Sequence, residues 1–370
     1  MAEEVVLMKG NEAIAHAAIR FGVDGYFGYP ITPQSEVLET LAEQKPWETT
    51  GMVVLQAESE VSAINMVYGG AATGKMVMTS SSSPGVSLKQ EGISYLAGAE
   101  LPCLVVNVMR GGPGLGTIQP SQADYFQTVK GGGHGDYHLV VLAPSSIQEM
   151  VDLTSDAFDI GDKYRCPVMI MGDGMLGQMM EPVEFKDADV NELPEKTWAT
   201  TGTGMKRKKN IINSLFLEAS ELEKLVLERQ ERYAQIAKNE VRYEAVDVED
   251  ADVVLVAYGT TSRIAKTAMA KAKEMGLKVG IIRPITLWPF PFEAFNKALN
   301  GKDKKFLCVE MSTGQMVEDV KLAVGDKAEV HFFGRTGGIV PTPKEILNKI
   351  IDFSWRGREK PSAPLFFFEK

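Results

Sequence analysis

Leu104-Val105-Val106-Asn107-Val108 is a short and almost wholly apolar run in the first third of the chain. Such a run is too short and too apolar for a surface helix, and it is typical of a strand buried on both faces of a parallel sheet. Similar runs alternate with amphipathic stretches on either side of it, as they do in repeated strand–helix units. These further runs are Val53–Leu55, Met76–Met78, Leu139–Leu142 and Val168–Met171. The pattern predicts a parallel-sheet domain that extends to about Phe185.

The same alternation resumes at Asp252, after a stretch of different character. Residues 186–250 are interpreted as a linker that begins polar and aperiodic and then forms a charged amphipathic helix from Ser214 to Arg242. Beyond it, strands are expected at Val253–Ala257, Val279–Ile282, Phe306–Val309 and Val330–Phe333, with helices at Arg263–Met275 and Met316–Val324. The predicted organisation is therefore an α/β domain at 1–185, a linker at 186–250, a second α/β domain at 251–350 and a C-terminal arm at 351–370.

Composition and charge narrow the classes of partner. The 370 residues carry a net charge of −10, so a broad basic surface for nucleic acid is not expected. The basic run 206–209 is followed by many acidic residues and is interpreted as a solvated linker surface. No apolar run approaches the roughly 18 residues of a membrane-spanning helix, and no secretion signal is recognised. We expect a cytoplasmic protein with no nucleic-acid and no membrane partner.

The three cysteines, Cys103, Cys166 and Cys308, are far apart, and each lies in an apolar run. Without a C-x-x-C spacing, neither a disulfide framework nor a zinc or iron–sulfur site within this chain is expected. His134 and His138 are four residues apart, but the glycine-rich sequence around them cannot be a helix. A metal site there is not expected, since no third ligand is in view.

Several loops that follow predicted strands contain residue types unusual for a simple connection, and α/β proteins place ligands on such loops. In Gly28-Tyr29-Pro30-Ile31-Thr32-Pro33 the second proline favours a stiff, extended backbone that orients the Thr32 hydroxyl. The run Ser80–Gly85 offers hydroxyls and backbone amides. A further such loop begins at Arg110, at the end of the strand quoted first, and continues as Gly111-Gly112-Pro113-Gly114.

Arg110 needs an anionic partner, because a guanidinium at a buried strand end loses its hydration. One interpretation is a bidentate clamp on the carboxylate of a small acid. The other is an internal salt bridge, for instance to Glu58 or Asp124. The residues by themselves favour the two about equally.

Glu58 and Glu60 open the helix predicted after the strand at Met52–Leu55. Acids in a first turn complement the helix dipole, and this is the simpler interpretation. The functional alternative is a carboxylate held in a cleft with a shifted pKa. Composition does not separate them.

Two further motifs are discounted. Gly172-Asp173-Gly174 begins like a magnesium–diphosphate motif, but the downstream spacing to an asparagine does not fit, and a strand-ending turn is favoured. The run Tyr258–Thr261 follows a strand and could cradle a phosphate, yet it lacks the lysine of a nucleotide-binding loop.

Five motifs, taken in order, carry a family resemblance. They are Tyr29-Pro30-Ile31-Thr32-Pro33, Glu58-Ser59-Glu60, Arg110-Gly111-Gly112-Pro113, Gln119-Pro120-Ser121-Gln122 and Glu310-Met311-Ser312-Thr313-Gly314-Gln315. Together they resemble the alpha-type chain of the 2-oxoacid:ferredoxin oxidoreductases, and the opening of the chain is most similar to the branched-chain (2-oxoisovalerate) type. The resemblance extends from the N-terminus to about Ile350.

This resemblance implies a thiamine diphosphate pyrimidine-binding fold followed by a transketolase C-terminal-like fold. The thiamine diphosphate would be shared with a beta-type chain that carries the diphosphate and Mg. A gamma-type chain and a small iron–sulfur chain with [4Fe-4S] clusters would complete the enzyme. It would convert a 2-oxoacid and coenzyme A to acyl-CoA and CO2 with reduction of ferredoxin.

The resemblance also implies roles for individual residues. Glu60 matches the glutamate that hydrogen-bonds the aminopyrimidine ring and promotes ylid formation. Thr32 matches a threonine that contacts the substrate, and Arg110 matches the arginine that holds the 2-oxoacid carboxylate. Ser312 departs from the family pattern, which has asparagine there. Alternative functions are a family member acting on 2-oxoglutarate or pyruvate, and a non-catalytic assembly subunit.

Overall fold

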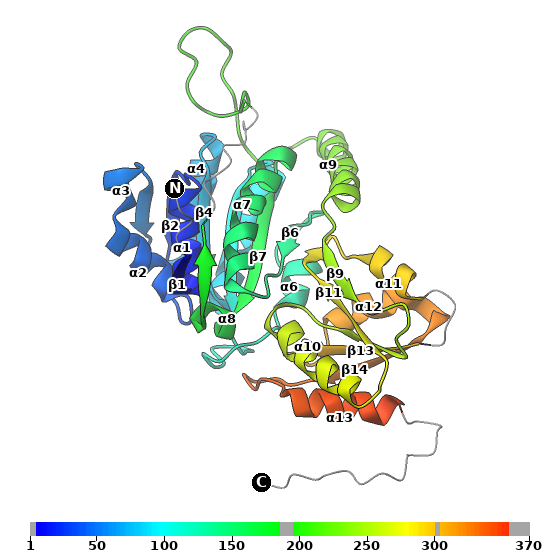
Figure 1. Cartoon of the computed structure of the whole chain (residues 1–370). Coiled ribbons are helices and arrows are strands. Elements are labelled where there is room, and N and C mark those ends of the chain that lie inside the picture. Colours follow the sequence, from blue (N-terminus) through cyan, green and yellow to red (C-terminus); the bar gives the residue numbers. More distant parts are fainter. Residues whose placement is uncertain (1–4, 186–194, 300–303, 355–370) are drawn as a thin grey trace.

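The computed structural model describes residues 5–185, 195–299 and 304–354. Its largest sheet has seven strands in the order β12-β6-β7-β5-β4-β2-β3 (Figure 1). All neighbours in this sheet are parallel except the β12–β6 pair. In sheet order the strands are β12 (Thr286–Trp288), β6 (Val140–Leu142), β7 (Pro167–Asp173), β5 (Cys103–Met109), β4 (Val77–Ser81), β2 (Gly25–Gly28) and β3 (Val53–Gln56). The predicted parallel sheet is confirmed.

The central strands β5 and β7 are buried along their whole length because helices cover both faces of this sheet. Val105 packs with α4 and α5 on one face, whereas its neighbour Val106 packs with α1, α2 and α7 on the other. The helices of this half are α1 (Gly10–Arg20), α2 (Ser35–Gln44), α3 (Pro46–Thr49), α4 (Glu60–Ala72), α5 (Ser83–Gly98), α6 (Tyr125–Val129), α7 (Ile147–Tyr164) and α8 (Gly174–Gln178).

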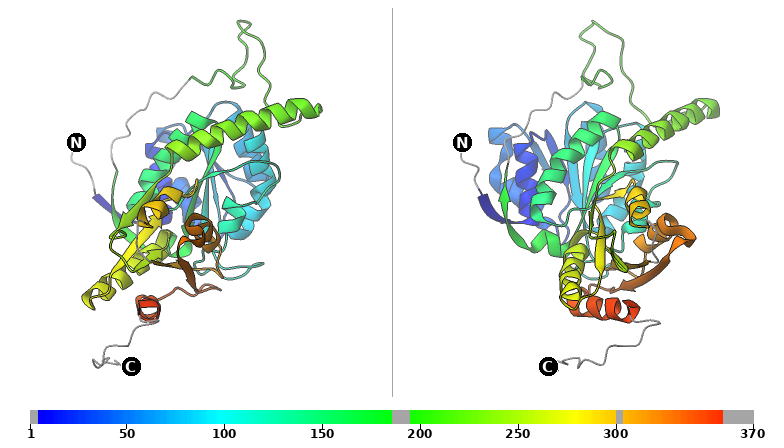
Figure 2. Two further views of the ribbon diagram at one scale, coloured as in Figure 1. Left: turned by 90° about the vertical axis from the view of Figure 1, so that its right-hand side faces the viewer. Right: turned by 45° about the vertical axis from the view of Figure 1, so that its right-hand side comes forward.

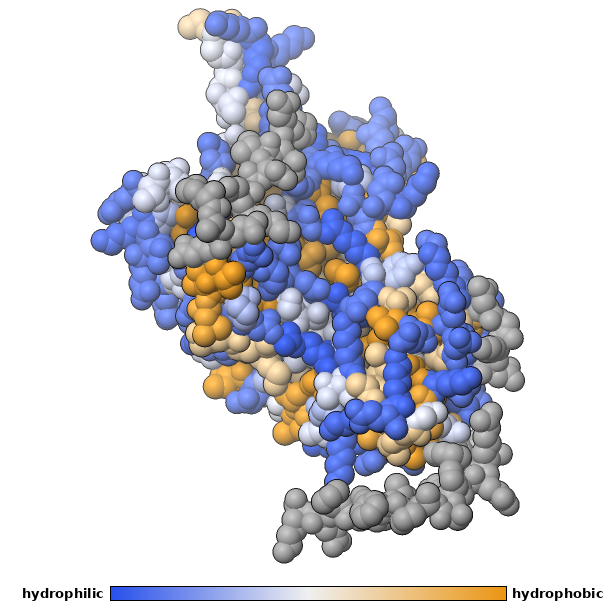
Figure 3. Space-filling view, in the orientation of Figure 1, coloured by the Kyte–Doolittle hydropathy of each residue, from blue (hydrophilic) through white to orange (hydrophobic). Residues whose placement is uncertain are grey.

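A separate antiparallel ribbon pairs β1 (Val5–Lys9) with β8 (Met180–Glu184). Val5 and Leu7 are each 62% exposed and lie on one face of the ribbon with Met180. Figure 3 shows apolar colour at the surface in the region where Figure 1 places this ribbon.

The second sheet has the order β14-β13-β10-β11-β9, with only the β9–β11 pair antiparallel. Its strands are β14 (Glu329–Gly334), β13 (Lys305–Glu310), β10 (Val253–Val256), β11 (Val279–Pro284) and β9 (Tyr243–Val246). Its helices are α10 (Gly259–Glu274), α11 (Phe292–Ala298), α12 (Met316–Val324) and α13 (Pro343–Ser354), with a 3-10 turn at Gly325–Lys327. The fold is thus α/β with two largely parallel sheets.

The segment expected to be a linker contributes to both halves. Its charged helix, α9 (Ala219–Asn239), begins five residues later than the expected Ser214 and lies along the first-sheet half (Figure 2). Tyr233 and Ile236 of α9 are buried in the core of that half. β9 then joins the second sheet.

In the second half, α10 begins at Gly259, four residues before the expected Arg263. The first four residues of the arm expected at 351–370 are instead the end of α13, which closes at Ser354, and the remainder, 355–370, lies outside the described residues.

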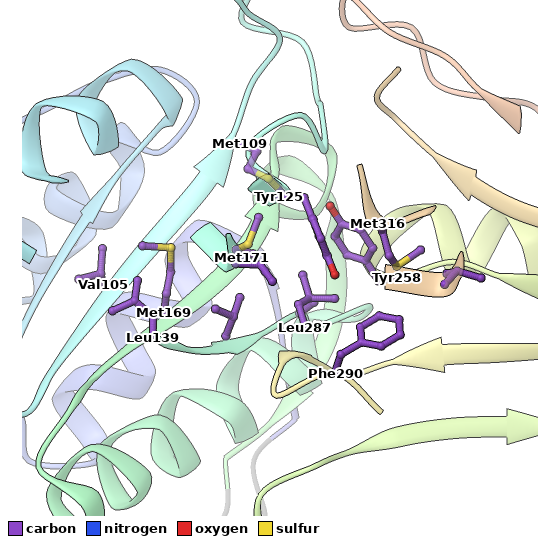
Figure 4. Close-up of a cluster of buried hydrophobic side chains, with 14 of the residues drawn as sticks. Val105, Met109, Tyr125, Leu139, Met169, Met171, Tyr258, Leu287, Phe290 and Met316 are labelled. Atoms are coloured by element: carbon purple, nitrogen blue, oxygen red, sulfur yellow. The ribbon is translucent and has the colours of Figure 1, made fainter. Parts of the chain in front are cut away.

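One continuous apolar core joins the two sheets. Tyr125 and Tyr258 face one another with ring centroids 6.0 Å apart, and Figure 4 shows methionines on both sides of this pair. β12 strengthens the junction, because it follows the second sheet's β11 in the chain but pairs with β6 of the first sheet. Among the described residues, no helix is long and apolar enough to cross a membrane.

The motif at Gln119–Gln122 and the motif at Glu310–Gln315 are hydrogen-bonded to each other at this junction. The buried amide of Gln122 donates to the Tyr258 carbonyl at 2.9 Å and accepts from Thr261 Oγ1 and from the Met311 amide. A second side chain crosses the junction from the other half, because the Gln315 amide donates to the Ala123 carbonyl at 2.8 Å. The two motifs, about 190 residues apart, therefore hold the halves together.

Candidate active site

Glu60 is the first residue of α4, and the Ser59 side chain caps this helix by accepting from the Ser62 amide. Its side chain is buried, at 7% exposed. It lies against Gly85 in the first turn of α5, where a Cβ atom would be 2.8 Å from Glu60 Oε1. A glycine there leaves room for the carboxylate between the two helices.

Glu58 has a different environment, although it is only two residues away. It is exposed, and its carboxylate accepts hydrogen bonds from Ser62 Oγ at 2.5 Å and Ser59 Oγ at 3.0 Å. These hydroxyls lower the pKa of Glu58. Glu58 therefore belongs to the helix cap, whereas Glu60 is the acid that is withdrawn from solvent.

Three consecutive hydroxyl residues end β4 next to this carboxylate, and a fourth, Ser82, precedes α5. Thr79, Ser80, Ser81 and Ser82 are all fully buried. Ser80 Oγ binds the Tyr26 hydroxyl at 2.7 Å and donates to Gln34 Oε1 at 2.5 Å. The hydroxyls of Ser81 and Ser82 have no hydrogen-bond partner, which is costly for buried polar atoms and is common where a ligand binds.

Lys89 of α5 is a residue of this site that sequence reasoning missed. It is fully buried, and its Nζ donates to Thr79 Oγ1 at 2.6 Å and to the Ser80 carbonyl at 3.5 Å. Burial lowers the pKa of Lys89 to about 7, although the nearby Glu60 charge raises it. The sequence signal was present, because Lys89 falls at helical spacing among the buried apolar positions Val86 and Ile93.

Arg110 is buried, at 8% exposed, and forms neither of the salt bridges considered from the sequence. Its Nη1 donates to the Thr32 carbonyl at 2.9 Å and its Nη2 to the Leu115 carbonyl at 3.1 Å, while Nε has no partner. Asp124 instead accepts from Ser83 and Asn107. The guanidinium therefore has no carboxylate partner among the described residues.

Thr32 and Arg110 are thus brought together, and the first turn of α5 connects them to Glu60. Ser83 Oγ accepts from the Arg110 amide at 3.0 Å and also lies 3.1 Å from the Arg110 carbonyl, while its own hydrogen is directed to Asp124 at 2.6 Å. Two residues later Gly85 contacts Glu60. One helix start therefore fixes the relative position of the predicted cofactor and substrate residues.

Thr32 is exposed and lines a cavity of ≈ 610 Å³. The cavity lies between the Thr32–Pro33 loop, the loop that contains Gln119, and the start of α8 at Gly174 and Met175. Val340, from the loop before α13, also lines it. The cavity is large enough for a small organic acid, and residues from both halves of the chain form its wall.

The discounted motifs have structural roles. Asp173 ends β7 and caps α8, where its carboxylate accepts from the amides of Met175 and Leu176 at 2.9 and 3.2 Å. Burial raises the pKa of Asp173.

His138 stacks on Trp288 with centroids 4.6 Å apart. Among the described residues, no cluster of three or more His, Cys, Asp or Glu is placed to hold a metal ion.

Ser312, the departure from the family pattern, is also bound internally. Its hydroxyl donates to Glu310 Oε2 at 2.8 Å and accepts from the Gly314 amide at 3.0 Å. Glu310 in turn accepts from backbone amides at the start of α12. Ser312 therefore supports the turn between β13 and α12.

Two family models match the chain. One, described as pyruvate flavodoxin/ferredoxin oxidoreductase, thiamine diphosphate-binding, matches residues 16–249. The other, described as pyruvate:ferredoxin oxidoreductase core domain II, matches residues 251–346. With the α/β fold and the buried glutamate, they define a chain of a thiamine diphosphate-binding oxidoreductase.

Individual relatives narrow this class. The chain is 54% identical over 344 residues to ketoisovalerate oxidoreductase subunit VorB of Methanothermobacter marburgensis, covering 93% of this chain and 96% of that protein. It is 35% identical over 378 residues to 2-oxoglutarate synthase subunit KorA of Methanothermobacter thermautotrophicus, covering 94% and 98%. The chain belongs to the 2-oxoacid:ferredoxin oxidoreductase family and is an enzyme subunit, as the sequence resemblance predicted.

Solved structures agree with this assignment. A 2-oxoglutarate:ferredoxin oxidoreductase from Magnetococcus marinus, with 2-oxoglutarate, coenzyme A and succinyl-CoA bound, matches with a TM-score of 0.84 and 29% identity. The match covers 95% of this chain and 65% of that one, so this chain spans slightly less than two thirds of its length. A split-gene transketolase shares the fold at 11% identity and a TM-score of 0.56, covering 93% of this chain and 97% of that one.

Proposed function

We propose that this chain is the alpha-type subunit of an enzyme that oxidatively decarboxylates branched-chain 2-oxoisovalerate to acyl-CoA and CO2, with reduction of ferredoxin. The observation that carries the choice of substrate is the difference in identity between relatives. The ketoisovalerate oxidoreductase subunit is 54% identical, whereas the 2-oxoglutarate synthase subunit is 35% identical over a comparable span. In this proposal, residues 1–185 form the pyrimidine-binding domain and 251–350 the transketolase C-terminal-like domain.

Glu60 is the proposed contact to the thiamine diphosphate. A cofactor ring with a basic nitrogen fits the geometry, because Glu60 is a buried carboxyl group and, like the Ser81 hydroxyl, which has no partner among the described residues, it lies against Gly85. When bound, thiamine diphosphate supplies a nucleophilic carbon and accepts the electrons left by decarboxylation. Glu60 would hold a proton at its carboxyl oxygen and exchange it with the ring nitrogen.

Arg110 and Thr32 are the proposed substrate contacts. Arg110 is a permanent cation with an unpartnered Nε and no carboxylate partner, although its other nitrogens bind carbonyls. A 2-oxoacid carboxylate would supply the missing negative charge and accept a charge-assisted hydrogen bond. The Thr32 side chain would contact the same substrate from the cavity wall.

The remaining parts of the enzyme are assigned to partner chains. A beta-type chain would carry the diphosphate and Mg, since the Asp173 carboxylate already binds the α8 amides. A gamma-type chain and a small iron–sulfur chain would pass electrons to ferredoxin. The three cysteines of this chain are buried, and burial raises the pKa of Cys166 to about 12, which disfavours the thiolate that iron requires.

Purification of the native complex tests this proposal. The co-purifying chains are identified, and the complex is assayed with coenzyme A and a viologen dye against a panel of 2-oxoacids. We expect the highest kcat/KM with 2-oxoisovalerate. A preference for 2-oxoglutarate or pyruvate would contradict the substrate, and purification without partner chains would contradict the assembly.

A further inference from the structure

Lys89 is a buried cation that the proposed reaction leaves unused. Its exposed fraction is zero, and among the described residues Nζ donates to two oxygens, Thr79 Oγ1 at 2.6 Å and the Ser80 carbonyl at 3.5 Å. Neither oxygen carries a charge. A buried ammonium with only neutral partners is costly unless an anion lies nearby.

The anion near Lys89 is Glu60. Lys89 lies four residues after Gly85 on α5, so the two share a helix face, and Gly85 contacts the Glu60 carboxylate. The charge of Glu60 acts on Lys89 and raises its pKa, whereas burial lowers it. Burial is the larger effect and lowers the pKa of Lys89 to about 7. Lys89 therefore gains or loses its proton close to neutral pH.

The other polar groups around Lys89 do not supply a competing charge. Tyr26 on β2 is hydrogen-bonded to Ser80, and burial raises its pKa to about 12, so it stays neutral in the working range. Thr79 and Ser80 on β4 are neutral, and Glu60 is the charged group from α4. Among the described residues, Glu60 is the charge that is shown to act on Lys89.

We propose that Lys89 is a positioning residue that favours the carboxylate form of Glu60 and thereby promotes proton transfer from Glu60 to the cofactor ring. The inference rests on the proposed function. In that transfer, an O–H bond at Glu60 breaks and an N–H bond at the ring nitrogen forms, with no change in oxidation state. The ammonium would attract the negative charge that the transfer leaves on the Glu60 carboxylate.

The first test follows hydrogen–deuterium exchange at C2 of thiamine diphosphate in the assembled enzyme as a function of pH. Lys89→Met removes the charged nitrogen and keeps an unbranched stem of the same four atoms in length. We expect the pH at which exchange falls to half its maximum to rise by about one unit or more. Thr79→Val keeps the lysine but removes its nearest acceptor, and we expect a smaller shift in the same direction. An unchanged profile in both variants would overturn the proposal.

Lys304→Met is the matched control. Lys304 is also buried, at 2% exposed, and its Nζ donates to the carbonyls of Val248 and Glu249 in the second half. This variant is expected to lose stability without any change in the pH profile of exchange. A shift in Lys304→Met equal to that in Lys89→Met would mean that loss of a buried lysine, rather than its action on Glu60, causes the effect.

A second readout needs no cofactor. The pKa of Lys89 is lowered from 10.5 to about 7 in the folded protein, so between these pH values the unfolded chain binds one proton more. Lys89 therefore makes stability rise with pH across this range. Thermal unfolding of the cofactor-free complex should lose this rise in Lys89→Met, and a wild-type slope in the variant would contradict the burial argument.

The variant Glu60→Gln separates a failure of the proposed function from a failure of the inference about Lys89. Normal C2 exchange in Glu60→Gln would overturn the role of Glu60 and thus the proposed function. Loss of exchange in Glu60→Gln combined with an unchanged Lys89→Met profile would overturn the Lys89 inference alone.

Discussion

Gly85 and Glu60 are packed so closely that a Cβ atom at position 85 would lie 2.8 Å from Glu60 Oε1 and 2.1 Å from Ser81 Oγ. The glycine belongs to α5 and the glutamate to α4, and this contact sets where the carboxylate points. The same helix turn contacts the backbone of Arg110 through Ser83. It therefore links the residue proposed to contact the cofactor, Glu60, to the residue proposed to bind the substrate, Arg110.

Gly85→Ala is therefore expected to weaken thiamine diphosphate binding by about tenfold or more, because the methyl group must displace the carboxylate or the serine. Isothermal titration of the cofactor into the assembled complex measures the effect. Gly69→Ala is the control, because Gly69 lies in α4 with no atom within 4 Å of its Cβ position. That change should raise stability by about 0.5–1 kcal/mol and leave binding unaltered.

Glu60→Gln should abolish C2 proton exchange while the complex still assembles, because the amide keeps the shape but cannot supply a proton. Nuclear magnetic resonance of the bound cofactor in deuterated solvent measures exchange, and size-exclusion chromatography measures assembly. Glu58→Gln is the matched control, since Glu58 is exposed and its carboxylate accepts hydrogen bonds from the hydroxyls of Ser59 and Ser62. Equal rates in the two variants would refute the distinction made between the acids.

Arg110→Ala should raise the KM for the 2-oxoacid by about tenfold or more, with a much smaller change in cofactor affinity. Loss of a charge-assisted hydrogen bond to the substrate carboxylate is the physical reason. Steady-state kinetics with varied 2-oxoacid, and separately with varied thiamine diphosphate, give the two values. Equal effects on both would count against a carboxylate clamp, because Arg110 also supports the Thr32 backbone.

Gln122→Ala should lower the free energy of unfolding by roughly 2–4 kcal/mol, because it leaves three buried groups of the second half without their partner. Chemical denaturation of the full-length chain measures this. Gln230→Ala is a suitable control, as Gln230 is exposed and makes one long hydrogen bond, at 3.3 Å, to Asp136. Similar losses in the two variants would argue against the proposed junction.

The strands could be predicted from the local sequence because they depend on neighbouring residues. The apolar run at Leu104–Val108 had to be a doubly buried strand, and the structure extends it by only one residue at each end, to Cys103–Met109. The helix starts at Ala219 and Gly259 were less accurately predicted. Gly259 has a φ of +53° and packs near Gln122, which is a tertiary contact with no local signal.

The sequence alone determined the two α/β halves and the family, because strand periodicity and the order of the motifs are properties of the linear chain. It also singled out Thr32, Glu60 and Arg110 as the residues proposed for the site. Only the tertiary structure decided which acid is buried, that Arg110 lacks a salt-bridge partner among the described residues, and that the charge of Glu60 raises the pKa of the buried Lys89. Burial and charge pairing depend on which helices pack together. Residues 60, 85 and 89 come from two helices, and only the α4–α5 contact makes them one site.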